Sequence, residues 1–156
     1  MSTTLPRTEC SEPGSLVEGQ TVDALLRGRV VLRQPASGFR TNMDAVWLAA
    51  FAWAREARAG ERPKVARSVL DLGAGVGPVS LVLLVAGAAE RVTMLDLDER
   101  LLALAAANAQ DSKVGERAAV VVHDLTERLP TELHGAFDLV VANPPYGKAG
   151  VWVPSE

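Results

Sequence analysis

Four consecutive residues, Asn143-Pro144-Pro145-Tyr146, can together hold a planar group that carries an NH2. A proline has a fixed φ and no N–H donor, so the carbonyls of the Pro-Pro pair are left as acceptors. The amide of Asn143 adds an acceptor oxygen, and the ring of Tyr146 adds a face for stacking. This set suits chemistry on an exocyclic or amide nitrogen, and we expect all four residues to act in catalysis.

A glycine-rich segment, Asp71–Gly77, follows a short apolar run. A dinucleotide site spaces its glycines as G-x-G-x-x-G, whereas here Gly73, Gly75 and Gly77 alternate and Asp71 precedes them. An acid at this point would repel a pyrophosphate. It suits a cationic ligand that carries an amino acid, such as S-adenosylmethionine, whose ammonium Asp71 can receive directly or through water. The alternative is a tight turn without a ligand.

Further acidic residues stand where a cofactor would need them. Asp96 lies about 20 residues past the glycines and can accept both ribose hydroxyls, although it can also favour a helix start. Asp124 can accept a hydrogen bond from an adenine amino group or cap a turn. Thr41 and Asp44 begin an earlier helix and can touch the methionine moiety or brace the glycine segment, or Asp44 simply favours the helix N-terminus.

The elements that must position these residues alternate along the chain. The expected strands are 68–72, 91–95, 118–123 and 137–142, and the expected helices are 78–86, 98–109 and, weakly, 126–133. Strand–helix alternation with apolar strands indicates an α/β fold in which a parallel sheet is covered by helices on both faces. Every polar landmark follows the end of a strand, where open α/β sheets bind ligands.

The N-terminal part has a different pattern. Residues 1–20 are rich in Ser, Thr, Glu, Pro and Gly, which predicts a disordered segment before a domain that spans 21–156. The runs 21–26 and 29–33 predict a hairpin. Asn42 is a plausible N-cap for a helix over 43–58, in which Trp47, Leu48 and Phe51 follow helical spacing and are expected to pack in the core.

Composition limits the alternatives. The 156 residues suit one domain, and the formal net charge is −3. Residues 1–67 hold 10 basic and 7 acidic side chains, and residues 68–156 hold 6 and 12, so the first part could orient an anionic partner. Arg33 and Arg40 could meet phosphates or lie in a solvated loop. One cysteine, Cys10, and no apolar stretch of membrane length indicate a soluble cytoplasmic protein.

Metal binding is not expected, because no cluster of Cys or carboxylate residues lies at metal-ligand spacing from His123 or His134. With no metal and no general base indicated, the nitrogen chemistry would depend on alignment of the reacting groups.

Together these segments resemble the class I S-adenosylmethionine-dependent methyltransferases, which have a Rossmann-like fold, and within them the methyltransferase small domain group that methylates the adenine amino group of valine tRNA. The resemblance spans about 21–150 and rests on segments 29–35, 38–46, 69–77, 95–98 and 143–146. It implies that the three glycines cradle the cofactor, that Asp96 binds its ribose, and that Asp124 binds its adenine. Asn143 and the Pro144 carbonyl would then accept from the target NH2, while Tyr146 stacks on a flipped base.

The same motifs leave two alternatives open. A protein glutamine methyltransferase would use the same pocket for a side-chain amide, although that group carries a helical N-terminal domain that residues 1–67 do not resemble. A non-catalytic cofactor-binding or interaction module is the other alternative.

The chain ends ten residues after Tyr146, whereas the resembled fold continues with further helices and three more strands. With these C-terminal strands missing, segment 137–142 would be an exposed apolar edge. Three explanations stay open: a truncated chain or gene, a decayed enzyme, or a domain in which a second copy or a partner covers this fourth strand. We expect weak or absent activity for an isolated monomer.

Overall fold

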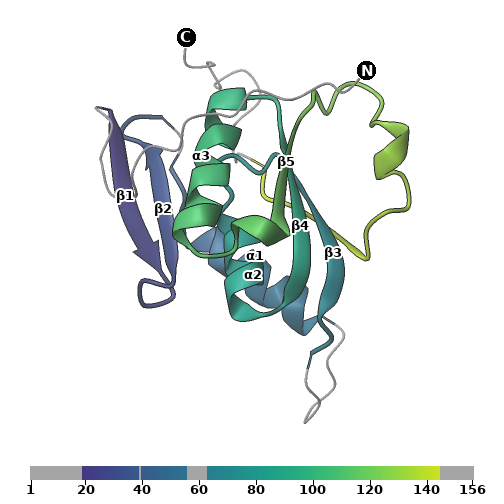
Figure 1. Ribbon diagram of the computed structural model, residues 1–156, viewed down its shortest axis with the longest axis horizontal. Helices are drawn as coiled ribbons and strands as arrows, with labels where there is room; N and C mark the ends of the chain where they lie inside the picture. Colours follow the sequence, from purple (N-terminus) through teal and green to yellow (C-terminus); the bar gives the residue numbers. More distant parts are fainter. Residues whose placement is uncertain (1–18, 39, 56–62, 145–156) are drawn as a thin grey trace.

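The computed structural model describes residues 19–38, 40–55 and 63–144 (Figure 1). A hairpin of β1 (Gln20–Leu25) and β2 (Val30–Pro35) is followed by an α/β part. The α/β part comprises α1 (Met43–Ala54), β3 (Ala66–Leu72), α2 (Pro78–Ala86), β4 (Ala89–Asp96), α3 (Glu99–Asp111), the 3-10 turn η1 (Gly115–Arg117), β5 (Ala118–Val122), the 3-10 turn η2 (Thr131–Leu133) and β6 (Leu139–Ala142). Within these ranges no helix is long and apolar enough to cross a bilayer.

Four strands form one parallel sheet in the order β5-β4-β3-β6. From β3 the chain passes through α2 to β4 and through α3 to β5, and it then returns past β4 and β3 to reach β6. Because crossovers are right-handed, the return connection lies on the face opposite α2 and α3. Figure 1 shows α3 on one side of β5 and the connection with η2 on the other. The predicted parallel α/β architecture is confirmed.

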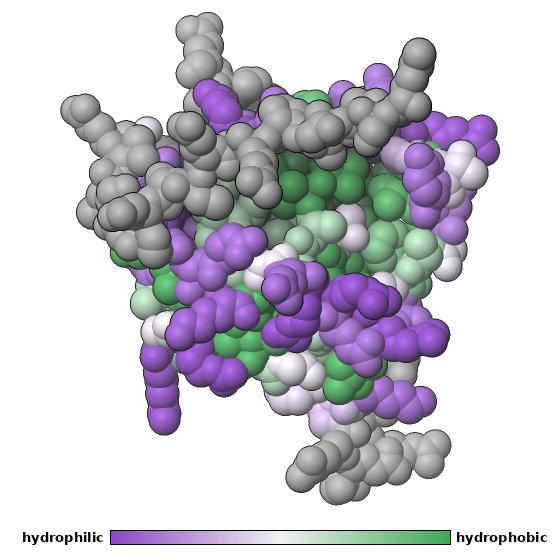
Figure 2. Space-filling model, in the orientation of Figure 1, coloured by the Kyte–Doolittle hydropathy of each residue, from purple (hydrophilic) through white to green (hydrophobic). Residues whose placement is uncertain are grey.

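Coverage of the sheet is uneven in the described residues. One face is packed by α2, which is buried along nearly its whole length, and by α3. The other face carries the connection with η2, where a helix over 126–133 was predicted and only the three-residue turn forms. Val120, Val122 and Val140 are 40%, 54% and 53% exposed, and Figure 2 shows a hydrophobic area beside the end of β5. The sheet thus leaves apolar surface open at both of its outer strands, β5 and β6.

Helix α1 packs through its small residues and not through its large ones. Ala45, Ala49 and Ala52 are buried, whereas Trp47 and Phe51 are 69% and 72% exposed. The expectation that these two aromatic residues belong to the core is therefore wrong, and Leu48 is only partly buried. The helix is apolar on all sides, so the hydrophobic period alone could not indicate which side faces inward.

The hairpin is held to the α/β part by side chains of α3. Asn108 is fully buried, accepts from Arg33 N–H at 2.7 Å and donates to Arg33 O at 3.1 Å. One turn later, Ser112 Oγ accepts from Val31 N–H at 3.0 Å. These contacts satisfy backbone groups of β2 that lack a strand neighbour on that side. Sequence reasoning did not identify this role of Asn108 and Ser112.

The predicted element limits need small corrections. Gly19 and Gln20 were assigned to the disordered segment, but Gln20 begins β1; residues 1–18 lie outside the described part. The expected end of the first helix at residue 58 also lies outside it, and the described helix ends at Ala54.

Candidate active site

The register of the sheet brings the predicted site segments to one edge. Leu72, the last residue of β3, pairs with Ala142 on one side and Leu95 on the other. Gly73 and Asn143 therefore leave the sheet from adjacent strands, which lie about 4.8 Å apart. Asp96 pairs with Val122, so the segment after β5 leaves at the same edge. From one outer strand to the other, the order at this edge is Asp124, Asp96, the glycine segment and Asn143.

The glycine segment is a tight loop that connects β3 to α2. The N–H groups of Gly73 and Ala74 both donate to Leu95 O, at 2.8 and 3.0 Å. Gly73 and Gly75 have φ of +67° and +56°, and a Cβ on either would meet no atom within 4 Å. Their open side leaves room for a ligand to approach the backbone closely, which fits the predicted cofactor cradle.

Gly77 has a different environment. Its φ is +83°, and a Cβ there would lie 2.7 Å from Met94 Sδ and 3.3 Å from Ala105 Cβ. The missing side chain thus allows the start of α2 to pack closely on β4 and α3. Gly77 therefore lacks the open side that Gly73 and Gly75 have. Its predicted contact with the cofactor stays a prediction.

Asp96 fixes the loop from the neighbouring strand. Its Oδ2 accepts from Gly75 N–H at 2.7 Å, and its Oδ1 accepts from Asp98 N–H at 3.0 Å. A carboxylate has about four lone-pair positions, so each oxygen can accept one more bond. The half-buried carboxylate is therefore held rigidly with capacity left for two hydroxyl donors. Asp98 caps α3 by accepting from Arg100 N–H at 2.9 Å.

Asp71 points into the interior. Its side chain is 1% exposed, and its Oδ2 accepts from Ser80 Oγ at 2.7 Å. Burial raises the pKa of this carboxyl from 3.8 to about 6, an effect that the Ser80 hydrogen bonds partly oppose. Asp71 thereby joins β3 to α2, and its predicted contact with a ligand ammonium, directly or through water, stays a prediction.

Asp124 follows β5 in a short turn. Its Oδ1 accepts from Thr126 N–H at 2.8 Å and from Thr126 Oγ1 at 2.7 Å, and these bonds lower the pKa of its carboxyl. The turn-capping alternative is thus present in the structure, and Oδ2 makes no hydrogen bond to the described residues. The adjacent His123 has a buried ring nitrogen, Nε2, without a hydrogen-bond partner among the described residues. The backbone N–H of His123 donates to Asp96 O at 3.0 Å.

Thr41 and Asp44 stand at the start of α1, where their described bonds are local. Thr41 N–H donates to the buried Gln34 Oε1 at 2.8 Å, and Asp44 N–H donates to Asn42 Oδ1, which confirms Asn42 as the N-cap. Asp44 is exposed. Neither bond joins Thr41 or Asp44 to the glycine loop, so their cofactor role stays a prediction.

The target side of the site is described only in part. Asn143 is half-buried and Pro144 is exposed, directly after β6. Pro145 and Tyr146 lie outside the described residues, so their predicted roles stay predictions. Among residues 19–38, 40–55 and 63–144, no cluster of three His, Cys, Asp or Glu side chains could hold a metal ion.

The chain is similar in sequence to two kinds of methyltransferase. The chain is 32% identical over 128 residues to the tRNA1(Val) (adenine(37)-N6)-methyltransferase of Porphyromonas gingivalis, a match that covers 81% of this chain and 48% of that protein. It is 37% identical over 83 residues to the release factor glutamine methyltransferase of Bordetella pertussis, covering 53% of this chain and 29% of that protein. The chain thus spans less than half the length of either relative.

The fold matches solved methyltransferases as well. The tRNA m1G37 methyltransferase of M. jannaschii superposes with a TM-score of 0.58 at 17% identity, over 82% of this chain and 36% of that one. This similarity concerns the fold alone. Residues 60–152 match the family described as methyltransferase small domain, which is more than half of the chain. The chain therefore belongs to the methyltransferase small domain family.

Proposed function

We propose that the chain carries the cofactor half of an S-adenosylmethionine-dependent methyltransferase that modifies an exocyclic adenine amino group in tRNA. The observation that supports this proposal most is that the cofactor and target landmarks lie at the same end of the sheet, where its strands terminate. The cofactor landmarks Gly73, Gly75 and Asp96 and the target landmark Asn143 leave adjacent strands at that edge. A donor and an acceptor bound there would face each other.

The cofactor would be held by backbone and carboxylate groups. Gly73 and Gly75 present open backbone, Asp96 offers the remaining lone pairs of a fixed carboxylate, and Asp124 offers Oδ2. When bound, S-adenosylmethionine supplies a methyl group on a sulfonium. No further cofactor is needed for transfer to a nitrogen.

The target nitrogen would be activated by acceptors alone. An aromatic amine is a weak nucleophile because its lone pair is delocalised into the ring. Asn143 Oδ1 and the Pro144 carbonyl would accept from its two N–H groups and favour a more tetrahedral nitrogen, at about 0.5–1.5 kcal/mol for each bond. Alignment of the reacting atoms supplies up to about 7–11 kcal/mol. The methyl group would bond to the nitrogen as its bond to sulfur breaks, which leaves a neutral thioether, and the nitrogen would then release one proton to solvent.

The RNA substrate is favoured by the extent of the match to the tRNA relative. Residues 60–156 are less than two thirds of the chain, so an alignment over 81% of it includes part of the segment before residue 60. The match to the glutamine methyltransferase covers 53%. A tRNA substrate also implies a cytoplasmic protein that binds nucleic acid.

The experiment measures transfer of a labelled methyl group to an unmodified valine tRNA transcript and, in parallel, to a release factor. It is run with the 156-residue chain and with a version extended to the length of the relatives, if the genome encodes one. Methylated adenine in the tRNA supports the proposal, whereas methylated glutamine supports the alternative. Cofactor binding without transfer to either substrate by both versions would favour a non-catalytic module.

A second part of the proposal concerns association. In the described residues β6 pairs only with β3, and Val140 on β6 is 53% exposed. An apolar strand with an unpaired edge favours pairing with another chain. We propose that a second copy or a partner protein covers this strand, and that the isolated monomer has weak activity.

A further inference from the structure

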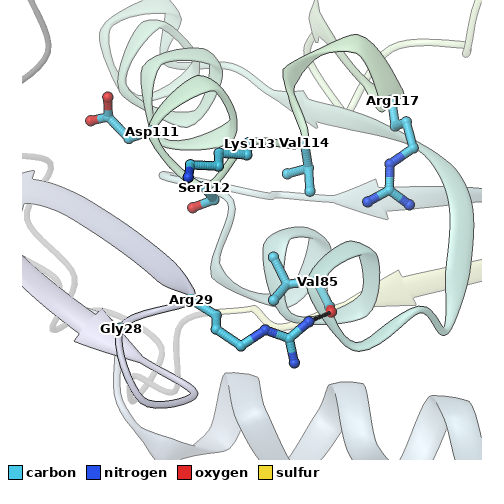
Figure 3. Close-up of a pocket in the computed structure, with 8 residues that line it drawn as sticks. All are labelled: Gly28, Arg29, Val85, Asp111, Ser112, Lys113, Val114 and Arg117. Carbon is cyan, nitrogen blue, oxygen red and sulfur yellow. Dashed lines mark hydrogen bonds between the residues drawn. The ribbon is translucent and has the colours of Figure 1, made fainter.

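A hollow lies away from the predicted active site. It has a volume of about 440 Å³ and is formed by the hairpin turn, the ends of α2 and α3, and η1 (Figure 3). Helix α2 begins beside the glycine loop and ends at this hollow. Nine helical residues span about 13 Å, so the two places are separated by at least the length of α2.

Basic side chains outnumber acidic ones in the lining of the hollow. Arg29, Lys113 and Arg117 line it, and the acid in the lining is Asp111. Asp111 Oδ2 accepts from Arg33 Nε at 2.8 Å, so this acid is neutralised by a fourth cation. Figure 3 shows the Asp111 carboxylate directed away from the space between Arg29 and Arg117. The hollow therefore has an excess of positive charge within a chain of net charge −3.

Two of the cations are held in place by backbone carbonyls. Arg29 Nη2 donates to Val85 O at 2.6 Å. Arg117 donates to Leu84 O at 3.3 Å and to Ala89 O at 3.5 Å. A guanidinium has five N–H donors, so both side chains keep donors for a ligand while their positions are fixed. Lys113 is exposed and follows α3 with a φ of +60°.

We propose that this hollow binds phosphate groups of the RNA backbone, at a distance from the nucleotide that is methylated. The inference rests on the proposed RNA substrate. A free phosphate at this exposed site would gain little, because exposed charge pairs contribute only about 0–1 kcal/mol each. A polyanion contacts several cations at once and releases counterions, which makes such a surface effective. A folded RNA also extends well beyond its target base.

The experiment measures binding of a labelled valine tRNA transcript by fluorescence anisotropy at several KCl concentrations. Lys113→Asn and Arg117→Gln remove one cation each, and Asn tolerates the left-handed backbone of position 113. Arg91→Gln is the matched control, because Arg91 is exposed but does not line the hollow. Thermal unfolding and calorimetry with S-adenosylmethionine accompany each variant, so that loss of folding or of the cofactor site is recognised.

We expect each hollow variant to weaken tRNA binding by roughly 3–10-fold at low salt and to reduce the slope of log K against log salt by about 0.7–0.9. Arg91→Gln should behave as wild type, and cofactor affinity should be unchanged in all variants. If wild type binds tRNA and both hollow variants bind it equally well, this inference is wrong and the proposed function stands. If wild type binds no tRNA while it binds the cofactor, both the RNA substrate and the hollow assignment are overturned.

Discussion

A methyl group at Gly77 would collide with the core, whereas one at Gly73 would enter open space. We expect Gly77→Ala to destabilise the fold by about 2–4 kcal/mol, since overpacking adds to the left-handed backbone strain. Gly73→Ala has only the strain and should lose about 1–2 kcal/mol. Denaturant unfolding of both variants measures the difference. Equal losses would mean that the contact with Met94 does not limit this position.

Asp71 makes the stability depend on pH in a direction opposite to that of the exposed carboxylates. Its pKa is about 6 in the folded state and ordinarily 3.8, so the folded protein binds this proton more tightly between those values. Ionisation of Asp71 therefore lowers stability as pH rises through this window, by about 3 kcal/mol above pH 6. Asp98, Asp124 and Asp138 have lowered pKa values and contribute stability that is lost as pH falls.

The variant Asp71→Asn isolates this effect. Asn can still accept from Ser80 Oγ but cannot ionise, so the variant should match wild type near pH 4 and exceed it by several degrees in Tm near pH 7. Thermal unfolding from pH 4 to 8 measures the difference between the two proteins. A variant less stable than wild type at pH 7 would show that the buried charge has a compensating partner.

At the scale of elements, one buried amide connects three parts of the fold. Asn108 bonds to Arg33 on β2 and donates to Val76 O in the glycine loop at 3.1 Å. Asn108→Asp keeps the size but removes both donors and buries a charge, so we expect a loss of about 3–5 kcal/mol and faster amide exchange in the hairpin. Ser112→Ala, which removes a single hydroxyl from the same face, is the control and should lose about 1 kcal/mol. Unchanged exchange in β2 of Asn108→Asp would contradict this account.

Elements with strong end signals could be predicted from the sequence. Helix α2 spans Pro78–Ala86, as predicted. Proline suits the first helical position, and Gly87 after the last one has a φ of +75°. The helix expected over 126–133 failed at Pro130, which lacks an N–H and disfavours helical backbone at Leu129. The sequence also indicated which residues follow the strands. Because the strands are parallel, these residues were expected at the same end of the sheet.

What the sequence could not show depends on contacts between distant segments. The side of the apolar helix α1 that faces inward is set by packing on α2, and the partner of Asp71 is set by where Ser80 points. No sequence pattern indicated what Asn108 or Arg29 contacts, because Asn108 bonds to the backbone 75 residues away and Arg29 to the backbone 56 residues away in the sequence. The hollow lined by Arg29 is likewise visible only in the folded chain.

At the scale of the whole molecule, α1 presents a row of large apolar side chains to solvent. Met43, Trp47 and Phe51 are spaced four residues apart and are 57%, 69% and 72% exposed. Residues at this spacing share one side of a helix, and contiguous apolar surface of this kind marks association sites. The row adds to the unpaired edge of β6 and supports association of the chain with a second copy or a partner.

The double variant Trp47→Glu, Phe51→Glu tests whether this row takes part in self-association. If it does, sedimentation should show wild type associating with rising concentration and the double variant remaining monomeric, because glutamates would be desolvated in the interface. Thermal stability should change little, since both side chains are exposed in the monomer. Val22→Glu, at a 44% exposed position on β1, should leave association unchanged. Association of the double variant at wild-type strength would exclude this row, and a monomeric wild type would exclude self-association.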